Sequence, residues 1–189
     1  MTHRWALIVG PKGSGKTTLA ARVARALTER GVSVGGVLQE ASIRDGERVG
    51  FQARRVGAGG DQVPLARRGV APEGTPPERA HEFCSYVFDD GAFVQARSWV
   101  EHAADTADVV IVDEVSKLEV ARGGHHDGIR GALGAGALVL LVVRADQLFA
   151  VVERFELDDA IATLETADES GFSSFVDAVV RAARPGETS

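Results

Sequence analysis

The sequence predicts an α/β fold in three layers, in which a mainly parallel sheet carries helices on both faces and an antiparallel hairpin is inserted. Three observations support this fold class. Short apolar runs alternate with stretches of helical periodicity along most of the chain. The first apolar run, Trp5–Val9, ends at a glycine, as a buried parallel strand often does. Asp45-Gly46, a favoured hairpin turn, separates the extended runs Val37–Ile43 and Arg48–Val56.

The remaining elements follow from the same periodicities. Helices are expected where apolar residues recur at helical spacing, over Lys16–Arg30, Ala92–Ala104, Gly128–Leu133, Asp146–Arg154 and Phe172–Ala183. Further strands are expected over the short apolar runs Val32–Gln39, Val109–Val112, Leu138–Val143 and Ala160–Leu164. The alternation of the two patterns predicts helical crossovers between parallel strands.

Length, charge and cysteine content limit the possible classes of protein. A chain of 189 residues has the size of one domain, expected over residues 1–184, with Pro185–Ser189 fraying. The net charge of −6 disfavours nucleic acid as a partner, because its phosphates attract basic surfaces. The single cysteine, Cys84, is expected to be a half-buried structural thiol, and its lack of a disulfide partner indicates the cytoplasm. The longest apolar run, Ala135–Val143, is too short to cross a membrane.

The first strand–helix turn carries a complete phosphate-binding motif. Its residues match G-x-x-x-x-G-K-[ST] with one further threonine, and they are Gly10, Pro11, Lys12, Gly13, Ser14, Gly15, Lys16, Thr17 and Thr18. Glycines let successive backbone N–H groups turn inward toward phosphate oxygens, and the helix N-terminus adds a favourable dipole. Lys16 is expected to bridge the β- and γ-phosphates and Thr17 to ligate Mg²⁺. Lys12 is interpreted as a solvated charge of this loop.

Two acids follow the apolar run Val109–Val112. A parallel strand delivers such residues to its C-terminal edge, where ligands bind in open α/β sheets. Asp113 is therefore expected to hold Mg²⁺ through water, and Glu114 to polarise an attacking water as a general base or an orienting group. The alternative is an exposed acidic turn after a strand.

The stretch Asp113–Glu119 resembles the D-E-[IV]-x-K-[ML]-E signature of the cancer-related nucleoside-triphosphatase family, with Ser116 where that family usually has glycine. The hairpin resembles the family pattern G-G-F-x-x-E…R-x-G-x-x-x-G-F, matched here by Gly35, Gly36, Val37, Glu40, Arg44, Gly46, Gly50 and Phe51. The resemblance implies a P-loop nucleoside-triphosphatase fold. It also implies Mg²⁺-dependent hydrolysis of nucleoside triphosphates, ATP or GTP or both, to diphosphate and phosphate.

Several basic residues are candidates for further roles. Lys117 and Arg144 are candidates for stabilising charge on the transferring phosphoryl group, with surface ion pairing as the alternative for each. The segment Gly57–Arg79 is rich in Gly, Pro and Arg, and predicts a loop or lid extending to residue 82. This segment is expected to be mobile until a nucleotide binds, when Arg67 and Arg68 could close over the phosphates. The pair His125-His126 lacks ligand spacing to a third metal-binding residue, and a solvated loop is expected there.

Two other functions share the phosphate-binding motif. A nucleotide or small-molecule kinase would pass the phosphate to an acceptor hydroxyl, with the Arg-bearing loop as its lid. A GTP-binding adaptor, such as the molybdopterin-guanine-dinucleotide accessory protein, would assist a partner enzyme instead. Glu114 favours the hydrolase, because an acid directly after the metal-binding aspartate is typical of enzymes that activate water. A signalling GTPase is disfavoured because its N-K-x-D motif needs asparagine, which this chain lacks.

Overall fold

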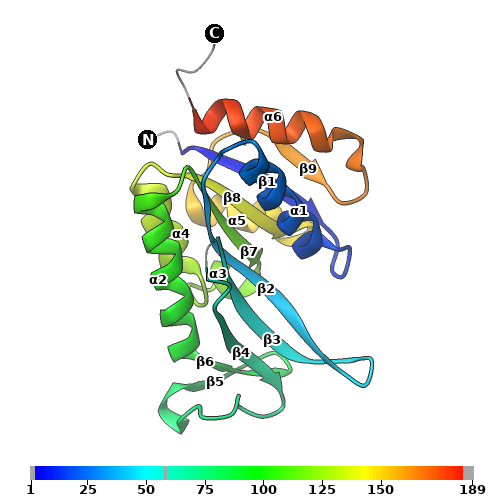
Figure 1. The fold of residues 1–189 in the computed structure, drawn as a ribbon. Coiled ribbons are helices and arrows are strands. Elements are labelled where there is room, and N and C mark those ends of the chain that lie inside the picture. The colour runs from blue at the N-terminus through cyan, green and yellow to red at the C-terminus, as the bar shows by residue number, and fades with distance from the viewer. Residues whose placement is uncertain (1–2, 58, 185–189) are drawn as a thin grey trace.

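The structure is a computed structural model that describes residues 3–57 and 59–184. Within these residues, nine strands form one sheet in the order β5-β6-β4-β3-β2-β7-β8-β1-β9 (Figure 1). The strands are β1 (Trp5–Gly10), β2 (Val34–Arg44), β3 (Glu47–Val56), β4 (Gln62–Arg68), β5 (Ala80–Phe83), β6 (Tyr86–Asp89), β7 (Val109–Val115), β8 (Leu138–Arg144) and β9 (Thr163–Glu165). Strands β2, β7, β8, β1 and β9 are parallel, whereas the neighbours from β2 to β5 pair antiparallel.

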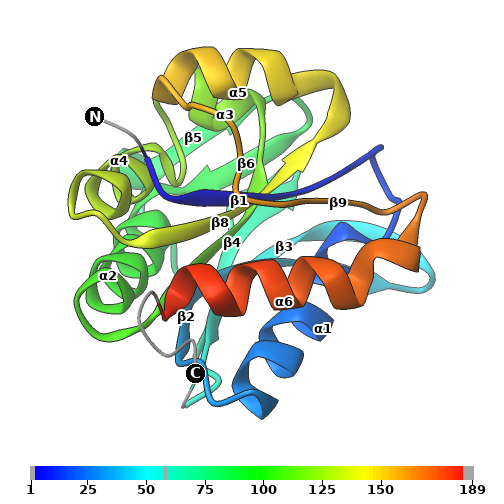
Figure 2. The ribbon, with the colours of Figure 1, turned by 90° about the horizontal axis from the view of Figure 1, so that it is seen from above.

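Helices cover both faces of the sheet, as predicted. They are α1 (Lys16–Glu29), α2 (Asp90–Thr106), α3 (Lys117–Val120), α4 (His126–Gly134), α5 (Leu148–Phe155) and α6 (Phe172–Ala183). Helices α1 and α6 lie on one side of the parallel strands and α4 and α5 on the other (Figure 2). The two apolar cores reflect this division: Leu19 and Val179 belong to one, and Phe93, Ile129 and Val151 belong to the other. The α/β three-layer prediction is confirmed.

Close backbone packing holds β2 against β7. At Gly36 the φ angle is 111°, and a Cβ atom built there would lie only 2.1 Å from the carbonyl oxygen of Ile111. No larger residue fits this approach, because the clash is with backbone rather than with a movable side chain. The N-terminal part of β2, Val34–Val37, pairs with Val109–Val112 of β7, which places Gln39 beside Asp113.

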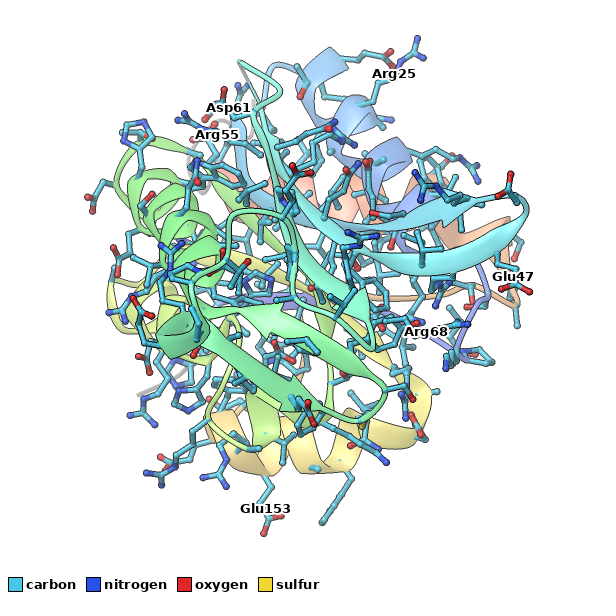
Figure 3. The ribbon with its side chains drawn as sticks, turned by 90° about the horizontal axis from the view of Figure 1, so that it is seen from below. Arg25, Glu47, Arg55, Asp61, Arg68 and Glu153 are labelled. Atoms are coloured by element: carbon cyan, nitrogen blue, oxygen red, sulfur yellow. The ribbon has the colours of Figure 1, made fainter. Side chains whose placement is uncertain are left out.

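The predicted hairpin is confirmed and is long. Strands β2 and β3 pair from Gly36↔Val56 to Arg44↔Glu47, and they are joined by Asp45 (φ 52°) and Gly46 (φ 79°). Two consecutive positive φ angles define the turn that Asp-Gly favours, because its twist matches that of the flanking strands. The hairpin extends beyond the helical layers (Figure 1), with Glu47 at its tip (Figure 3).

The expected loop or lid over Gly57–Arg79 is wrong for its central part. Residues 62–68 form β4, which lies between β3 and β6 in the sheet and buries Leu65 completely. Pro64 concealed this strand from the sequence pattern, because proline disfavours interior strands. A strand paired on both sides cannot swing as a lid without breaking two ladders, and Arg68 points outward from it (Figure 3).

Strands β5 and β6 and the single-turn helix α3 were not predicted. At four residues each, β5, β6 and α3 are too short to show a periodicity of their own. Cys84 lies in the turn between β5 and β6 and is exposed, so the expectation of a half-buried thiol is wrong. No helix in the described part of the chain has the length and apolarity to cross a membrane. The predicted frayed tail, Pro185–Ser189, lies outside the described residues.

Candidate functional site

The loop between β1 and α1 has the backbone of an anion cradle. Gly13 and Gly15 have φ angles of 78° and 85°, which place them in the left-handed region that favours glycine. Gly15 precedes α1 and carries no side chain that could cap the helix. The first-turn N–H groups of a 14-residue helix are therefore open to a ligand, and the helix dipole favours a negative one.

Lys16 is held in place over this loop. Its side chain is buried, and its ammonium group donates a 2.8 Å hydrogen bond to the carbonyl oxygen of Pro11. The partner is a neutral carbonyl and not a carboxylate, so the positive charge remains available to an anion. Behind the loop, Thr166 donates to the hydroxyl of Ser14 at 2.8 Å and braces it against the segment after β9. Lys12 is exposed at the loop surface.

Asp113 is completely buried beside the start of α1, so the alternative of an exposed acidic turn does not describe it. Its carboxylate accepts hydrogen bonds from the backbone N–H groups of Gln39, at 3.1 Å, and of Glu114, at 2.7 Å. The hydroxyl of Thr17 is a further hydrogen-bond partner. Burial raises the pKa of this carboxyl to about 6. A buried acid next to a hydroxyl provides two oxygen atoms that suit a hard cation.

Glu114 is directed by an irregularity in β7. The pairing of β7 with β8 shifts between Val112 and Val115, so that Asp113 and Glu114 form a bulge. Glu114 has a φ angle of 58°, an uncommon conformation for a residue with a side chain. The bulge interrupts the alternation of side chains along the strand, which leaves Asp113 buried and Glu114 half-buried at the cavity wall. Such strained residues are concentrated at functional sites.

Lys16, Thr17 and Glu114 line one cavity of about 540 Å³, and Asp113 is buried behind Thr17. The cavity is lined by the phosphate-binding loop, the start of α1, the β2–β3 hairpin and the end of β7, through Lys12, Gly13, Gly15, Lys16, Thr17, Thr18, Ala21, Gln39, Glu40, Ala41, Arg48, Phe51 and Glu114. A cavity of this size lies in the range of small-molecule sites.

The hairpin wall was the part of the cavity that sequence reasoning missed. Glu40 and Phe51 were noticed only through a family pattern, and Gln39, Ala41 and Arg48 were not considered. The Asp-Gly turn located the hairpin in the chain. It could not show that the hairpin lies against α1, because that depends on the packing of β2 against β7.

The two basic residues proposed to stabilise the transferring phosphoryl group do not line this cavity. Arg144 lies beside the loop, paired in register with Gly10, but its guanidinium makes two hydrogen bonds to Asp146, at 2.7 and 2.5 Å. The hydrogen bond to Asp146 raises the pKa of Arg144. The ion-pair alternative therefore describes Arg144 in this structure. Lys117 is exposed at the first position of α3.

A buried polar cluster follows Glu114 in the chain. The carboxylate of Glu119 accepts hydrogen bonds from the backbone N–H groups of Ser116, at 2.9 Å, and His125, at 3.2 Å. His125 and His126 are both buried, so the expected solvated loop is wrong: His125 packs edge-on against Phe93, from α2. No group of three His, Cys, Asp or Glu residues in the described part of the chain could hold a metal ion. The two hydrogen bonds to Glu119 fix the backbone at Ser116 and His125, in the segment after Glu114.

Burial shifts the pKa values of Glu119 and His125 in opposite directions. It raises the pKa of Glu119 from 4.5 to about 7 and lowers the pKa of His125 from 6.5 to about 4. Between pH 4.5 and 7 the folded chain holds a proton on Glu119 that the unfolded chain has lost. Stability contributed by Glu119 is therefore present below this window and is lost as the pH rises through it.

We expect Glu119→Gln to remove this pH dependence, because glutamine does not titrate. From pH 5 to pH 8, the unfolding free energy of the wild type should fall relative to that of the variant. The shift should be about 1.4 kcal/mol for each unit by which the pKa is raised. Denaturant unfolding with a chelator present measures it, and the exposed Glu153→Gln variant is the control (Figure 3). Parallel stability profiles for wild type and Glu119→Gln would show that Glu119 titrates normally.

Known proteins are similar to this chain in sequence and in fold. A family model described as "NTPase" matches residues 6–169. The nucleoside-triphosphatase THEP1 of Methanopyrus kandleri is 33% identical over 168 residues, which is 86% of this chain and 88% of the relative. The human cancer-related nucleoside-triphosphatase is 31% identical over 143 residues, 73% of each chain.

Two solved structures have the same fold. The solution structure of a human cancer-related nucleoside triphosphatase superimposes with a TM-score of 0.68 at 23% identity, covering 98% of this chain and all of the other. The crystal structure of THEP1 from Aquifex aeolicus gives 0.66 at 22% identity, covering 92% and 95%. These likenesses confirm the P-loop nucleoside-triphosphatase fold. With the family model matching most of its length, the chain belongs to the NTPase family.

Proposed function

We propose that this chain hydrolyses nucleoside triphosphates to diphosphate and phosphate, with Glu114 preparing the attacking water. The observation that carries the proposal is the bulge in β7, which brings Glu114 to the same cavity as Lys16 and Thr17. A carboxylate at this position can accept a proton from water while the phosphate-binding loop holds the triphosphate. The names of the relatives, nucleoside-triphosphatases in each case, support the same reaction.

The residues around Asp113 fit Mg²⁺. The Thr17 hydroxyl and the Asp113 carboxylate are hard oxygen donors in hydrogen-bond contact, and substrate phosphates with water would complete the shell. Bound Mg²⁺ would neutralise charge on the β- and γ-phosphate oxygens. With its pKa near 6, the Asp113 carboxyl is largely ionised at neutral pH, as a metal-binding group must be.

Each remaining group has a defined task in this proposal. Lys16 exchanges its contact with the Pro11 carbonyl for oxygens of the β- and γ-phosphates. The N–H groups of the loop and of the first turn of α1 bind the phosphate chain. Glu114 orients the water and takes its proton as the oxygen attacks the γ-phosphorus. The substrate is ATP, GTP or both, and the single cysteine and the net charge of −6 support a cytoplasmic protein without a nucleic-acid partner.

Phosphate release from ATP, GTP, CTP and UTP tests the reaction. We expect steady release with Mg²⁺ and no acceptor, and loss of release when the metal is chelated, because the terminal phosphate would then lack its counter-charge. Each reaction is repeated with a panel of hydroxyl acceptors. Low phosphate release, with formation of the nucleoside diphosphate that rises when an acceptor is added, would identify a kinase. Tight binding without release in any mixture would identify a binding adaptor.

A further inference from the structure

Arg48 is the arginine that lines the cavity. Within the described residues, the cations at its walls are Lys12 and Lys16 from the phosphate-binding loop and Arg48 from the hairpin. Arg48 lies near the start of β3, paired with Ile43 of β2, and is half-buried. It therefore reaches the cavity from a different element than the lysines do.

The guanidinium of Arg48 is oriented by an aromatic ring and has no acidic partner. Its central carbon lies 5.5 Å from the ring centroid of Phe51, and Phe51 in turn packs on Tyr86, with centroids 4.9 Å apart. In the described part of the chain, no carboxylate pairs with Arg48. Stacking on a packed ring restricts the guanidinium without neutralising its charge.

The acid by which the hairpin itself lines the cavity is already engaged. Glu40, which also lines the cavity, accepts a 2.7 Å hydrogen bond from Arg54 and a 3.4 Å bond from Gln52. The Arg54–Glu40 ion pair leaves the charge of Arg48 uncompensated. A half-buried cation without an anionic partner is unfavourable by itself, whereas a phosphate ligand would pair with it through strong charge-assisted hydrogen bonds.

The end of the cavity next to the hairpin is the end that would hold the terminal phosphate. Thr17 and Asp113 would hold the metal that neutralises charge on the terminal phosphates, and Glu114 would hold the water that attacks the γ-phosphate. Strand β2 is tied to this end, because the backbone of Gln39 donates to Asp113 and its carbonyl accepts from the Thr17 hydroxyl at 3.4 Å. Strand β3, with Arg48, is the next strand outward.

We propose that Arg48 binds the terminal phosphate of the triphosphate and stabilises the charge that develops on it as water attacks. This role rests on the proposed hydrolysis and assigns to Arg48 the task for which Lys117 and Arg144, which do not line the cavity, were the candidates from the sequence. An arginine supplied in cis can act in this way without a second protein. Because a diphosphate lacks the terminal phosphate, Arg48 should distinguish triphosphate from diphosphate.

The experiment compares Arg48→Gln with Arg44→Gln, a change of the same charge at an exposed position of the same hairpin that is absent from the cavity wall. For Arg48→Gln we expect kcat to fall by about 1,000-fold or more, because such arginines contribute about 10³–10⁵-fold to kcat. The calorimetric Kd for a non-hydrolysable triphosphate with Mg²⁺ should weaken by about 10-fold, and that for ADP by less than about 3-fold. Arg44→Gln should match the wild type.

Three outcomes would overturn the proposal. They are a kcat for Arg48→Gln near the wild-type value, an equal loss of ADP and triphosphate affinity, and an equal effect of Arg44→Gln. If Arg48→Gln does not fold, Arg48→Lys replaces it in the experiment. Lysine keeps the charge but lacks the planar guanidinium, so kcat should still fall by about 10-fold. A wild-type kcat for Arg48→Lys would then count against the role. If the wild type does not hydrolyse any triphosphate, the proposed function fails, and the two Kd values still test Arg48 by themselves.

Discussion

Replacing Glu114 with Gln is expected to lower steady phosphate release by about 10²–10⁴-fold, the usual contribution of a positioned general base. Glutamine keeps the size of the side chain and most of its hydrogen bonding, but it cannot accept the proton of the attacking water. Nucleotide binding should survive, because Lys16, Thr17 and Asp113 still hold the phosphates and the metal. Single-turnover kinetics together with calorimetry separate the two effects, and unhydrolysed triphosphate should persist on the variant.

Two further variants show whether the effect is specific to Glu114. Asp113→Asn should weaken Mg²⁺ binding as well as turnover, because the buried carboxylate beside Thr17 would lose its charge. Glu153→Gln, an equal change at an exposed position of α5, should leave both unchanged (Figure 3). Hydrolysis by Glu114→Gln at the wild-type rate would show that Glu114 is an ordinary surface acid and that the mechanism is wrong.

Lys16→Ala is expected to weaken triphosphate binding severely. The Lys16 ammonium is buried and has a neutral carbonyl as its partner, so the variant loses charge-assisted hydrogen bonds to two phosphates. Bonds to charged groups contribute about 1.5–3 kcal/mol each, so the loss in affinity should be roughly 100-fold or more. Thr17→Ala should instead reduce the dependence of binding and turnover on Mg²⁺, because the hydroxyl ligand is removed.

Calorimetry with ATP and a graded Mg²⁺ series distinguishes these two variants. Lys117→Ala is the matched control, because Lys117 is an exposed lysine outside the cavity wall. Normal ATP binding by Lys16→Ala would end the assignment of Gly10–Thr17 as the phosphate-binding loop. A large effect of Lys117→Ala would support a functional role for this exposed lysine.

Elements with long, unbroken patterns were predictable from the sequence. Helix α6 begins and ends at the predicted residues, Phe172 and Ala183, because its apolar residues keep one helical face throughout. Strand β4 was missed because its pattern contains Pro64, and its burial depends on pairing with β3 and β6. Short strands take their stability from neighbours that are distant in sequence, and no local pattern contains that information.

The burial of polar residues also could not be predicted from local sequence patterns. His125 was expected in a solvated loop because the adjacent histidines lack ligand spacing to a third metal-binding residue. The ring of Phe93, which covers His125, comes from a helix 32 positions earlier in the chain. Likewise, only the structure shows that Arg144 pairs with Asp146 and that Arg48 lines the cavity.

The sequence by itself determined the phosphate-binding loop and the acid pair, because the residues of each are contiguous and their spacing is enough to identify the chemistry. It also determined the α/β class, because helix and strand periodicities are local. Only the tertiary structure decided which further side chains reach the cavity. The bulge at Glu114 arises from a register shift between β7 and β8, and the wall at Arg48 arises from the packing of β2 against β7. Both depend on contacts between strands that are far apart in the chain.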